Sequence, residues 1–146
     1  MKVKIRLVDS SLTLPMYQTA GAAAQDLLVR EAVTIPPRGI AHASLNVCLK
    51  LPRGHFALLA ARSSLHKRGL MLANGVGVID EDFCGDNDEY KAVLYNFTDS
   101  LVLVKKGDRL VQVVILPVER VEWEPVLSTQ TVNRGAFGTT GEGTLV

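Results

Sequence analysis

Short segments of alternating apolar and polar residues recur along the chain, separated by turn residues at roughly ten-residue intervals. In residues 3–7 the apolar side chains alternate with basic ones, and in residues 41–51 five apolar side chains share one side. Pro52-Arg53-Gly54 provides a turn after the second of these segments. Similar segments follow at 56–61, 90–95, 101–104 and 110–116. This spacing predicts an all-β sandwich or barrel.

Two segments favour helix instead. Residues 20–33, AGAAAQDLLVREAV, are rich in strong helix formers, and intrinsic propensity alone predicts a helix there. Residues 63–67 form a second, shorter candidate, because Ser63 can cap the first turn and Gly69 can end the helix.

Length and composition indicate a single soluble domain of 146 residues that is 47% hydrophobic and 21% charged. The formal net charge is +1 and no segment gathers Lys and Arg, so nucleic-acid binding is not expected. No apolar run has membrane-spanning length, and the first residues lack the apolar core of a signal peptide. The two cysteines, Cys48 and Cys84, have no paired spacing and are interpreted as reduced thiols of a cytoplasmic protein.

The acid-rich stretch DEDFCGDNDE, residues 80–89, invites a calcium-loop interpretation. Asp82 and Gly85 would fall at suitable positions of such a loop, but Cys84 and Lys91 stand where it needs oxygen ligands. A solvated acidic turn is therefore favoured. The three histidines are too widely spaced for a zinc motif, and neither a P-loop nor a G-x-S-x-G elbow is present.

Two further stretches each allow a structural and a functional interpretation. In ARSSLHKRG, residues 61–69, a guanidinium precedes two hydroxyls, which suits either a phosphate cradle or a helix cap beside a surface arginine. In NRGAFGTTG, residues 133–141, a flexible end is one interpretation. The other is a tail whose lone aromatic, Phe137, stacks on a flat partner such as a base.

Five segments in order resemble the five motifs of the trimeric dUTP diphosphatases. They are AGAAAQDL (20–27), ARSSLHKRG (61–69), NGVGVIDEDFCG (74–85), GDRLVQVV (107–114) and RGAFGTTG (134–141). Each is weak by itself, whereas their combination is specific and extends over nearly the whole chain. The resemblance implies a distorted jelly-roll, β-clip-like all-β subunit with one short helix, assembled as a homotrimer. It also implies hydrolysis of dUTP to dUMP and pyrophosphate with Mg²⁺.

The resemblance assigns the base-binding side of the site to residues 74–83. Asp80 is implied to be the general base that activates the attacking water, at the mouth of a hairpin whose first arm runs from Gly75 to Ile79. The glycines of that arm would let its backbone approach the base closely. Phe83 stands where the family usually has Tyr, packing on the deoxyribose and excluding a 2′-hydroxyl. The implied readers of uracil are Asn74, Gly77, Val78 and Ile79.

The phosphate and metal side is implied to come from other segments. Arg62, Ser63 and Ser64 resemble the phosphate cradle, and Asp26 and Gln112 resemble residues that hold metal-bound waters. Gln112 also counts among the substrate-binding residues. The tail motif, which would stack on uracil and grip the terminal phosphates, is represented by Arg134, Phe137, Gly138, Thr139 and Thr140.

The implied organisation is one β domain, residues 1–127, followed by a mobile tail, residues 128–146, that closes over an active site. The resemblance also overrides the helix prediction, because residues 24–29 should be extended. Gln25 replaces the usual aromatic before Asp26, and the tail motif is shorter than the common form.

Two rival functions were weighed against dUTP hydrolysis. The first is a dCTP deaminase, which would need a glutamate near Val93, where no acid is found. The second is a dUTPase-like regulatory binding protein, which would have no need of the retained polar residues.

Overall fold

The computed structural model describes residues 1–133 and residue 135. Within this part of the chain the structure is nearly all β, as predicted. The elements in chain order are β1 (Lys4–Leu7), β2 (Gln25–Leu28), β3 (Val33–Ile35), β4 (Ile40–Ser44), β5 (Val47–Lys50), β6 (His55–Ala61), the 3-10 helix η1 (Leu65–Arg68), β7 (Leu70–Leu72), β8 (Gly77–Ile79), β9 (Lys91–Asn96), β10 (Val102–Val104) and β11 (Arg109–Pro117).

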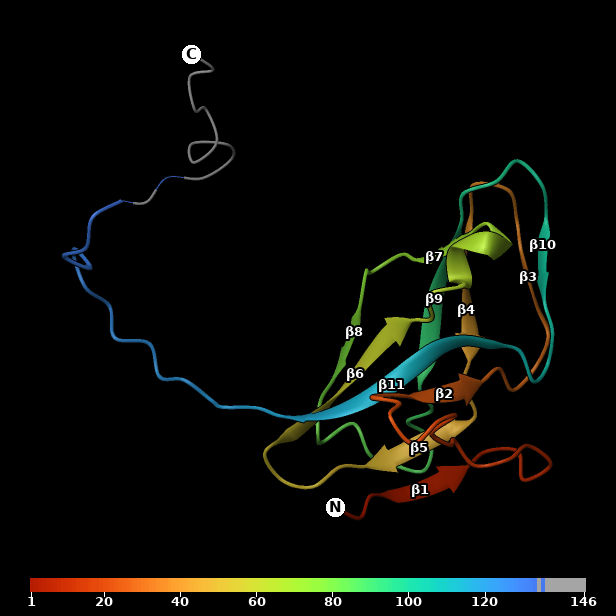
Figure 1. Cartoon of the computed structure of the whole chain (residues 1–146), viewed down its shortest axis with the longest axis horizontal. Coiled ribbons are helices and arrows are strands. Elements are labelled where there is room, and N and C mark those ends of the chain that lie inside the picture. The colour runs from red at the N-terminus through yellow and green to blue at the C-terminus, as the bar shows by residue number, and fades with distance from the viewer. Residues whose placement is uncertain (134, 136–146) are drawn as a thin grey trace.

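The strands form four antiparallel sheets around one core. The largest has the order β2-β11-β6-β8, and a second has the order β4-β9-β7. Two-stranded ribbons, β1-β5 and β10-β3, complete the domain at separate edges (Figure 1). The core holds fully buried side chains from most of these strands, among them Leu27, Ile35, Leu70, Leu94 and Val111. Strand β11 is the longest, and because it pairs with both β2 and β6 it joins residues that are distant in sequence.

The helix predicted from propensity for residues 20–33 is wrong, and the extended conformation implied for residues 24–29 is confirmed. Strand β2 occupies Gln25–Leu28 and pairs with β11, with Leu27 opposite Val111. Leu27 and Val29 are completely buried. Burial of their apolar surface, together with the backbone hydrogen bonds of β2, outweighs the small intrinsic preference for helix.

The short helix after β6 is confirmed as the four-residue 3-10 helix η1, and its end is as predicted. Gly69 lies in the left-handed region at φ 71° and forms the C-cap. The predicted cap by Ser63 is wrong, because the N-cap residue is Ser64 and its side chain makes no capping hydrogen bond. Both serine side chains therefore lie exposed beside Arg62.

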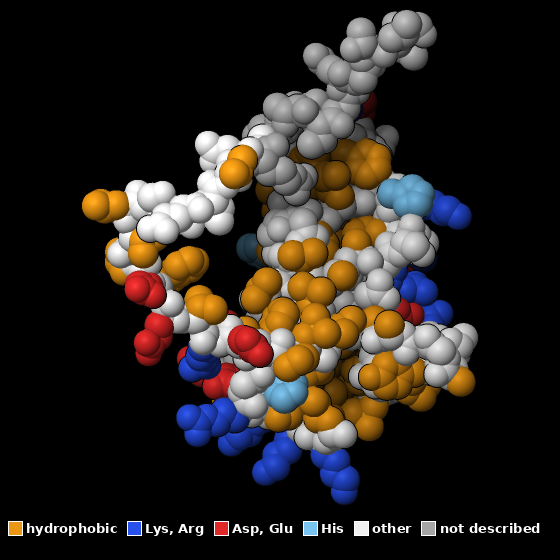
Figure 2. Space-filling view, turned by 60° about the vertical axis from the view of Figure 1, so that its left-hand side comes forward, with side chains coloured by type: hydrophobic (Ala, Val, Ile, Leu, Met, Phe, Trp, Pro, Cys, Tyr) orange, Lys and Arg blue, Asp and Glu red, His pale blue; other side chains and the backbone are white. Residues whose placement is uncertain are grey.

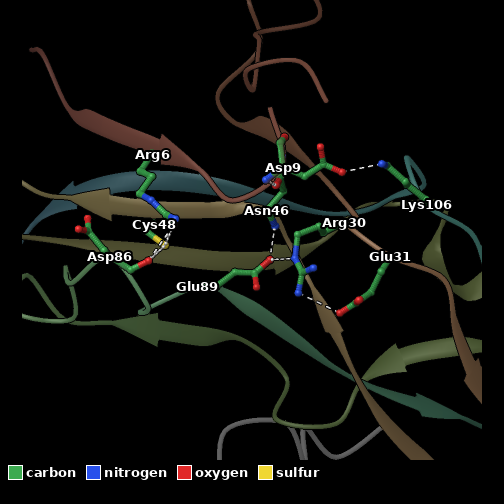
Figure 3. A network of polar contacts seen from close by, with 9 residues as sticks. All are labelled: Arg6, Asp9, Arg30, Glu31, Asn46, Cys48, Asp86, Glu89 and Lys106. Carbon is green, nitrogen blue, oxygen red and sulfur yellow. Dashed lines mark hydrogen bonds and ion pairs between the residues drawn. The ribbon is translucent and has the colours of Figure 1, made fainter. Parts of the chain in front are cut away.

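The single segment predicted for residues 41–51 is divided into β4 and β5 by Asn46, whose φ is 66°. The buried side chain of Asn46 accepts a hydrogen bond from the Asp9 N–H and donates to the Asp9 carbonyl. Glu89 accepts hydrogen bonds from the Asn46 N–H and from Arg30 Nε (Figure 3). Asn46 and Cys48, on the predicted polar side, are consequently buried, because β1 and the 84–89 loop cover them.

Beyond β11 the chain runs away from the domain as an extended arm, residues 118–133, which contains no strand (Figure 1). Trp123 is 88% exposed, and Val121, Val126 and Leu127 are exposed as well. The space-filling view shows hydrophobic side chains on the surface of the molecule (Figure 2). None of the described helical segments is long and apolar enough to cross a membrane.

Candidate active site

A buried carboxylate lies between two arginines at one end of the β2-β11-β6 sheet. Asp26 is 8% exposed, and its Oδ1 pairs with Arg62 Nε at 2.9 Å. Its Oδ2 lies 3.5 Å from Arg109 Nη1. The Arg62 guanidinium also donates through Nη1 to the carbonyl oxygen of Arg109 at 3.0 Å. These contacts hold Arg62 in one orientation and leave its remaining N–H donors available to an anion.

Strand register brings this cluster together. Gln112 is opposite Asp26 on β2 and opposite Ala60 on β6, so segments far apart in sequence meet on β11. The Gln112 Nε2 donates to the carbonyl of Ala61 at 3.1 Å. Because Ala61 directly precedes Arg62, this hydrogen bond ties the Gln112 side chain to the start of the Arg62 segment. The structure therefore brings together Asp26, Arg62 and Gln112 as expected, with Ser63 and Ser64 following Arg62 directly.

Sequence reasoning overlooked Arg109, the third charged member of the cluster beside Asp26 and Arg62. Its side chain faces the Asp26 carboxylate, while its carbonyl accepts a hydrogen bond from Arg62. It belongs to the segment GDRLVQVV, but nothing in that segment indicates where its side chain points. The irregular register between Arg109 and Val111 is what decides the direction.

A second group of predicted residues lies on and around β8. Asp80 and Asn74 are exposed, and Val78 is 63% exposed. Asp80 follows the end of β8 and borders a shallow hollow together with His55, Phe56 and Val78.

The first arm of the predicted hairpin, residues 75–79, is not paired with β9. β7 pairs with β9 and the Ala73 N–H donates to the Val93 carbonyl, but β8 then turns away and pairs with β6. Gly75, at φ 71°, allows this change of direction. Gly77 lies close to β6, since a Cβ there would lie 3.1 Å from the Leu59 Cβ, which is tighter than an ordinary contact.

Phe83 presents an aromatic ring at the edge of this second group. It is 42% exposed, and its centroid lies 6.2 Å from that of Tyr90. Tyr90 is 1% exposed, and its hydroxyl finds no hydrogen-bond partner among the described residues. The pKa of Tyr90 is raised to about 12, chiefly because burial disfavours the charged form and to a smaller extent because Cys48 and Cys84 lie nearby. Tyr90 is thus a buried, neutral ring beside Phe83.

The acid-rich loop uses several of its carboxylates in contacts within the protein. Asp88 accepts from the Gly85 N–H, Glu89 binds Arg30, and Glu81 binds Arg120. Among the described residues no group of three or more His, Cys, Asp or Glu side chains is arranged to hold a metal ion.

The Asp26 carboxylate fits an indirect contact with a hydrated cation. Its Oδ2 is buried and accepts no hydrogen bond from the part of the chain that the structure describes. The two flanking guanidiniums oppose direct approach of a cation, whereas a water molecule could donate to Oδ2.

The two groups of residues are far apart within one copy of the chain. Ile79 pairs with Ala57 near one end of β6, and Arg62 follows the other end. Continued by one residue, this register makes Phe56 the β6 residue opposite Asp80, and Arg62 lies six positions further along the chain. Six steps correspond to roughly 20 Å of strand at about 3.3 Å per residue. The predicted tail residues Arg134, Phe137, Gly138, Thr139 and Thr140 lie outside the described residues.

These features define an all-β fold of the jelly-roll class, with a carboxylate paired to two guanidiniums on one sheet and an exposed aspartate after a short strand. Residues 10–143 match the dUTPase family model, and the chain belongs to the dUTPase family.

Relatives in two bacteria match the chain over almost their full length. The deoxyuridine 5′-triphosphate nucleotidohydrolase of Anaplasma marginale is 40% identical and aligns over 97% of this chain and 99% of its own. The protein of the same name from a Hydrogenobaculum species is 36% identical, with the same two coverages.

Among solved structures, the crystal structure of dUTPase from Streptococcus mutans superimposes with a TM-score of 0.74 at 34% identity. The alignment covers 82% of this chain and 98% of that one. The predicted family and the predicted jelly-roll class are both confirmed.

Proposed function

We propose that the protein hydrolyses dUTP to dUMP and pyrophosphate, removing dUTP from the nucleotide pool and supplying dUMP for dTTP synthesis. The observation that carries this proposal is the ion pair of the buried Asp26 with the half-buried Arg62, which stands immediately before two exposed serines, on a chain of the dUTPase family. Asp26 fixes the guanidinium, so little conformational freedom remains to be lost when a phosphate binds. Arg62 then supplies charge, and Ser63 and Ser64 supply hydroxyl donors.

We assign the attack on the α-phosphorus to a water activated by Asp80. The exposed carboxylate at the end of β8 is open to solvent and can accept a proton once the water lies within hydrogen-bond reach. Asn74 and the backbone of Gly77, Val78 and Ile79 are assigned to uracil. We assign Phe83 to the deoxyribose, where its ring would leave no room for a 2′-hydroxyl.

A homotrimer would unite the two halves of the site. Asp80 must reach a water beside the phosphate that Arg62 holds, and a separation of roughly 20 Å prevents this within one copy. A second copy that presents its β8 beside the first copy's Arg62 would remove this difficulty. The exposed apolar side chains of the 118–133 arm also suit burial against another subunit.

We further propose that residues 128–146 act as a mobile tail that closes over a site of the trimer. Arg134, Phe137, Gly138, Thr139 and Thr140 would then contact substrate.

The family implies Mg²⁺, and the residues present fit a metal that is contacted through water molecules. Asp26 and Gln112 would hold the metal through water, with the triphosphate supplying the direct ligands. The bound ion would neutralise phosphate charge.

Two free cysteines, one of them buried, support placement in the reducing cytoplasm. Neither rival function is favoured. Val93, where a deaminase would need a glutamate, is half-buried on β9 opposite His42.

The test is pyrophosphate release from dUTP, with UTP and dCTP as matched controls. We expect release from dUTP alone, since the deoxyribose and uracil contacts select it. Release of ammonia from dCTP would instead indicate a deaminase. Binding of dUTP without turnover would indicate a regulatory protein.

A further inference from the structure

Three consecutive acids follow β8, and they lie in different environments. Asp80 and Asp82 are exposed to solvent. Glu81 is turned back into the protein, with a side chain that is only 22% exposed. Its Oε2 accepts a hydrogen bond from the N–H of Gly54, and its Oε1 pairs with Arg120 Nη2 at 3.0 Å. One carboxylate therefore joins the turn between β5 and β6 to the beginning of the C-terminal arm.

Gly54 closes this unit from the other side. Its carbonyl accepts a hydrogen bond from the Val118 N–H at 2.9 Å, while its N–H is bound by Glu81. The φ of 72° at Gly54 turns these two backbone groups toward different partners. Loop, turn and arm are thus tied together by the contacts of Glu81, Gly54, Val118 and Arg120, which we call the Glu81 clamp.

The backbone at Asp80 has few other restraints. The last ladder pair of β8 is Ile79 with Ala57, and beyond it the Asp80 carbonyl accepts a hydrogen bond from the Phe83 N–H at 3.3 Å. The next contact that fixes the loop is made by the Glu81 side chain, which binds Gly54 and Arg120. A change of backbone angle at Glu81 would therefore move the Asp80 carboxylate directly.

We propose that Glu81 is a positioning residue for the reaction, which holds Asp80 in line with the attacking water. This inference rests on the proposed function. Catalysis is sensitive to such placement, because a displacement of about 1 Å can cost about a hundredfold in rate. The ion pair with Arg120 contributes little to stability, since the Arg120 side chain is 77% exposed. The hydrogen bond from the Gly54 N–H to Oε2 is the stronger restraint, because it fixes the side chain to the backbone of a turn.

The reach of the side chain, rather than its charge, should decide the effect of substitution. Glu81→Gln keeps the length and an oxygen that accepts from the Gly54 N–H, so kcat should stay within about fivefold of wild type. Glu81→Asp keeps the charge but is one methylene too short, so kcat should fall about tenfold or more. Glu81→Ala should lower kcat by about ten- to a hundredfold. In each variant KM should change by less than about threefold, because Glu81 contacts no substrate.

The experiment compares kcat and KM for dUTP in full-length wild type and these variants, well below the unfolding temperature. Asp82→Ala is the matched control, because it removes an exposed acid next in sequence, and it should remain close to wild type. Sedimentation of each variant confirms an unchanged assembly.

The result that overturns the proposal is wild-type kcat in both Glu81→Asp and Glu81→Ala. The opposite order, with Glu81→Asp active and Glu81→Gln inactive, also overturns it by showing that charge acts rather than position. An equal loss in Asp82→Ala does the same. If Glu81→Ala does not assemble, the proposal is still tested by which of Glu81→Gln and Glu81→Asp has the higher kcat. Failure of wild type to hydrolyse dUTP would refute the proposed function instead.

Discussion

Replacing Tyr90 by phenylalanine should stabilise the protein, which is unusual for a substitution in a core. The side chain is 1% exposed, and no described residue forms a hydrogen bond with its hydroxyl. A buried polar group without a partner costs about 1–3 kcal/mol. Tyr90→Phe removes that cost and keeps the ring that packs near Phe83. After allowance for the lost contacts of one oxygen atom, we expect a gain of about 1 kcal/mol at pH 7.

The same substitution should alter the response to alkali. Burial raises the pKa of Tyr90 to about 12 in the native state, whereas the ordinary pKa of a tyrosine is 10.0. The stability that comes from keeping the phenol neutral is therefore complete below pH 10 and is lost as the pH rises toward 12. The stability gap between Tyr90→Phe and wild type should widen by about 2 kcal/mol by pH 12.

Urea unfolding followed by far-ultraviolet circular dichroism, at one fixed protomer concentration, measures both effects. At neutral pH a gain of 1 kcal/mol corresponds to a rise in Tm of about 2–4 °C. Tyr17→Phe is the matched control, because the Tyr17 side chain is 60% exposed and its variant should stay within about 0.5 kcal/mol of wild type. Destabilisation of Tyr90→Phe by 1 kcal/mol or more at pH 7 would show that the hydroxyl has a partner and that this reasoning is wrong.

Three further outcomes are expected. Asp80→Asn should lower kcat by about a hundred- to ten-thousandfold while dUTP still binds, because an amide cannot accept the proton; near-wild-type turnover would remove Asp80 from this role. Truncation before Arg134 should cripple turnover but leave the assembly folded, since Phe137 is the only large apolar side chain of the tail motif; intact turnover, or loss of the assembly in sedimentation, would contradict the assignment. Gly69→Ala should destabilise the protein by about 2 kcal/mol or more in urea unfolding. The φ of Gly69 is 71°, and the added Cβ would lie 2.3 Å from Thr98 Cγ2. An unchanged urea midpoint would show that the turn relaxes freely.

The sequence by itself determined the fold class, most strand positions and the family. Alternation with period two and regularly spaced turns are local properties of a chain, so they can be recognised without knowledge of the contacts. The cap at Gly69 was predictable for the same reason, because a residue that ends a helix in the left-handed region is usually glycine. The five ordered motifs likewise identified Asp26, Arg62, Asp80 and Gln112 as candidate site residues.

Only the tertiary structure decided matters that depend on distant partners. Residues 20–33 favour helix locally, yet pairing with β11 and burial of Leu27 make residues 25–28 a strand. The environments of the acids after β8 also depend on distant partners, since Glu81 faces Gly54 and Arg120 while Asp80 remains exposed. Strand register and loop packing set these environments, and both arise from contacts between residues far apart in the chain. Neighbouring acids in one short sequence can therefore lie in different environments.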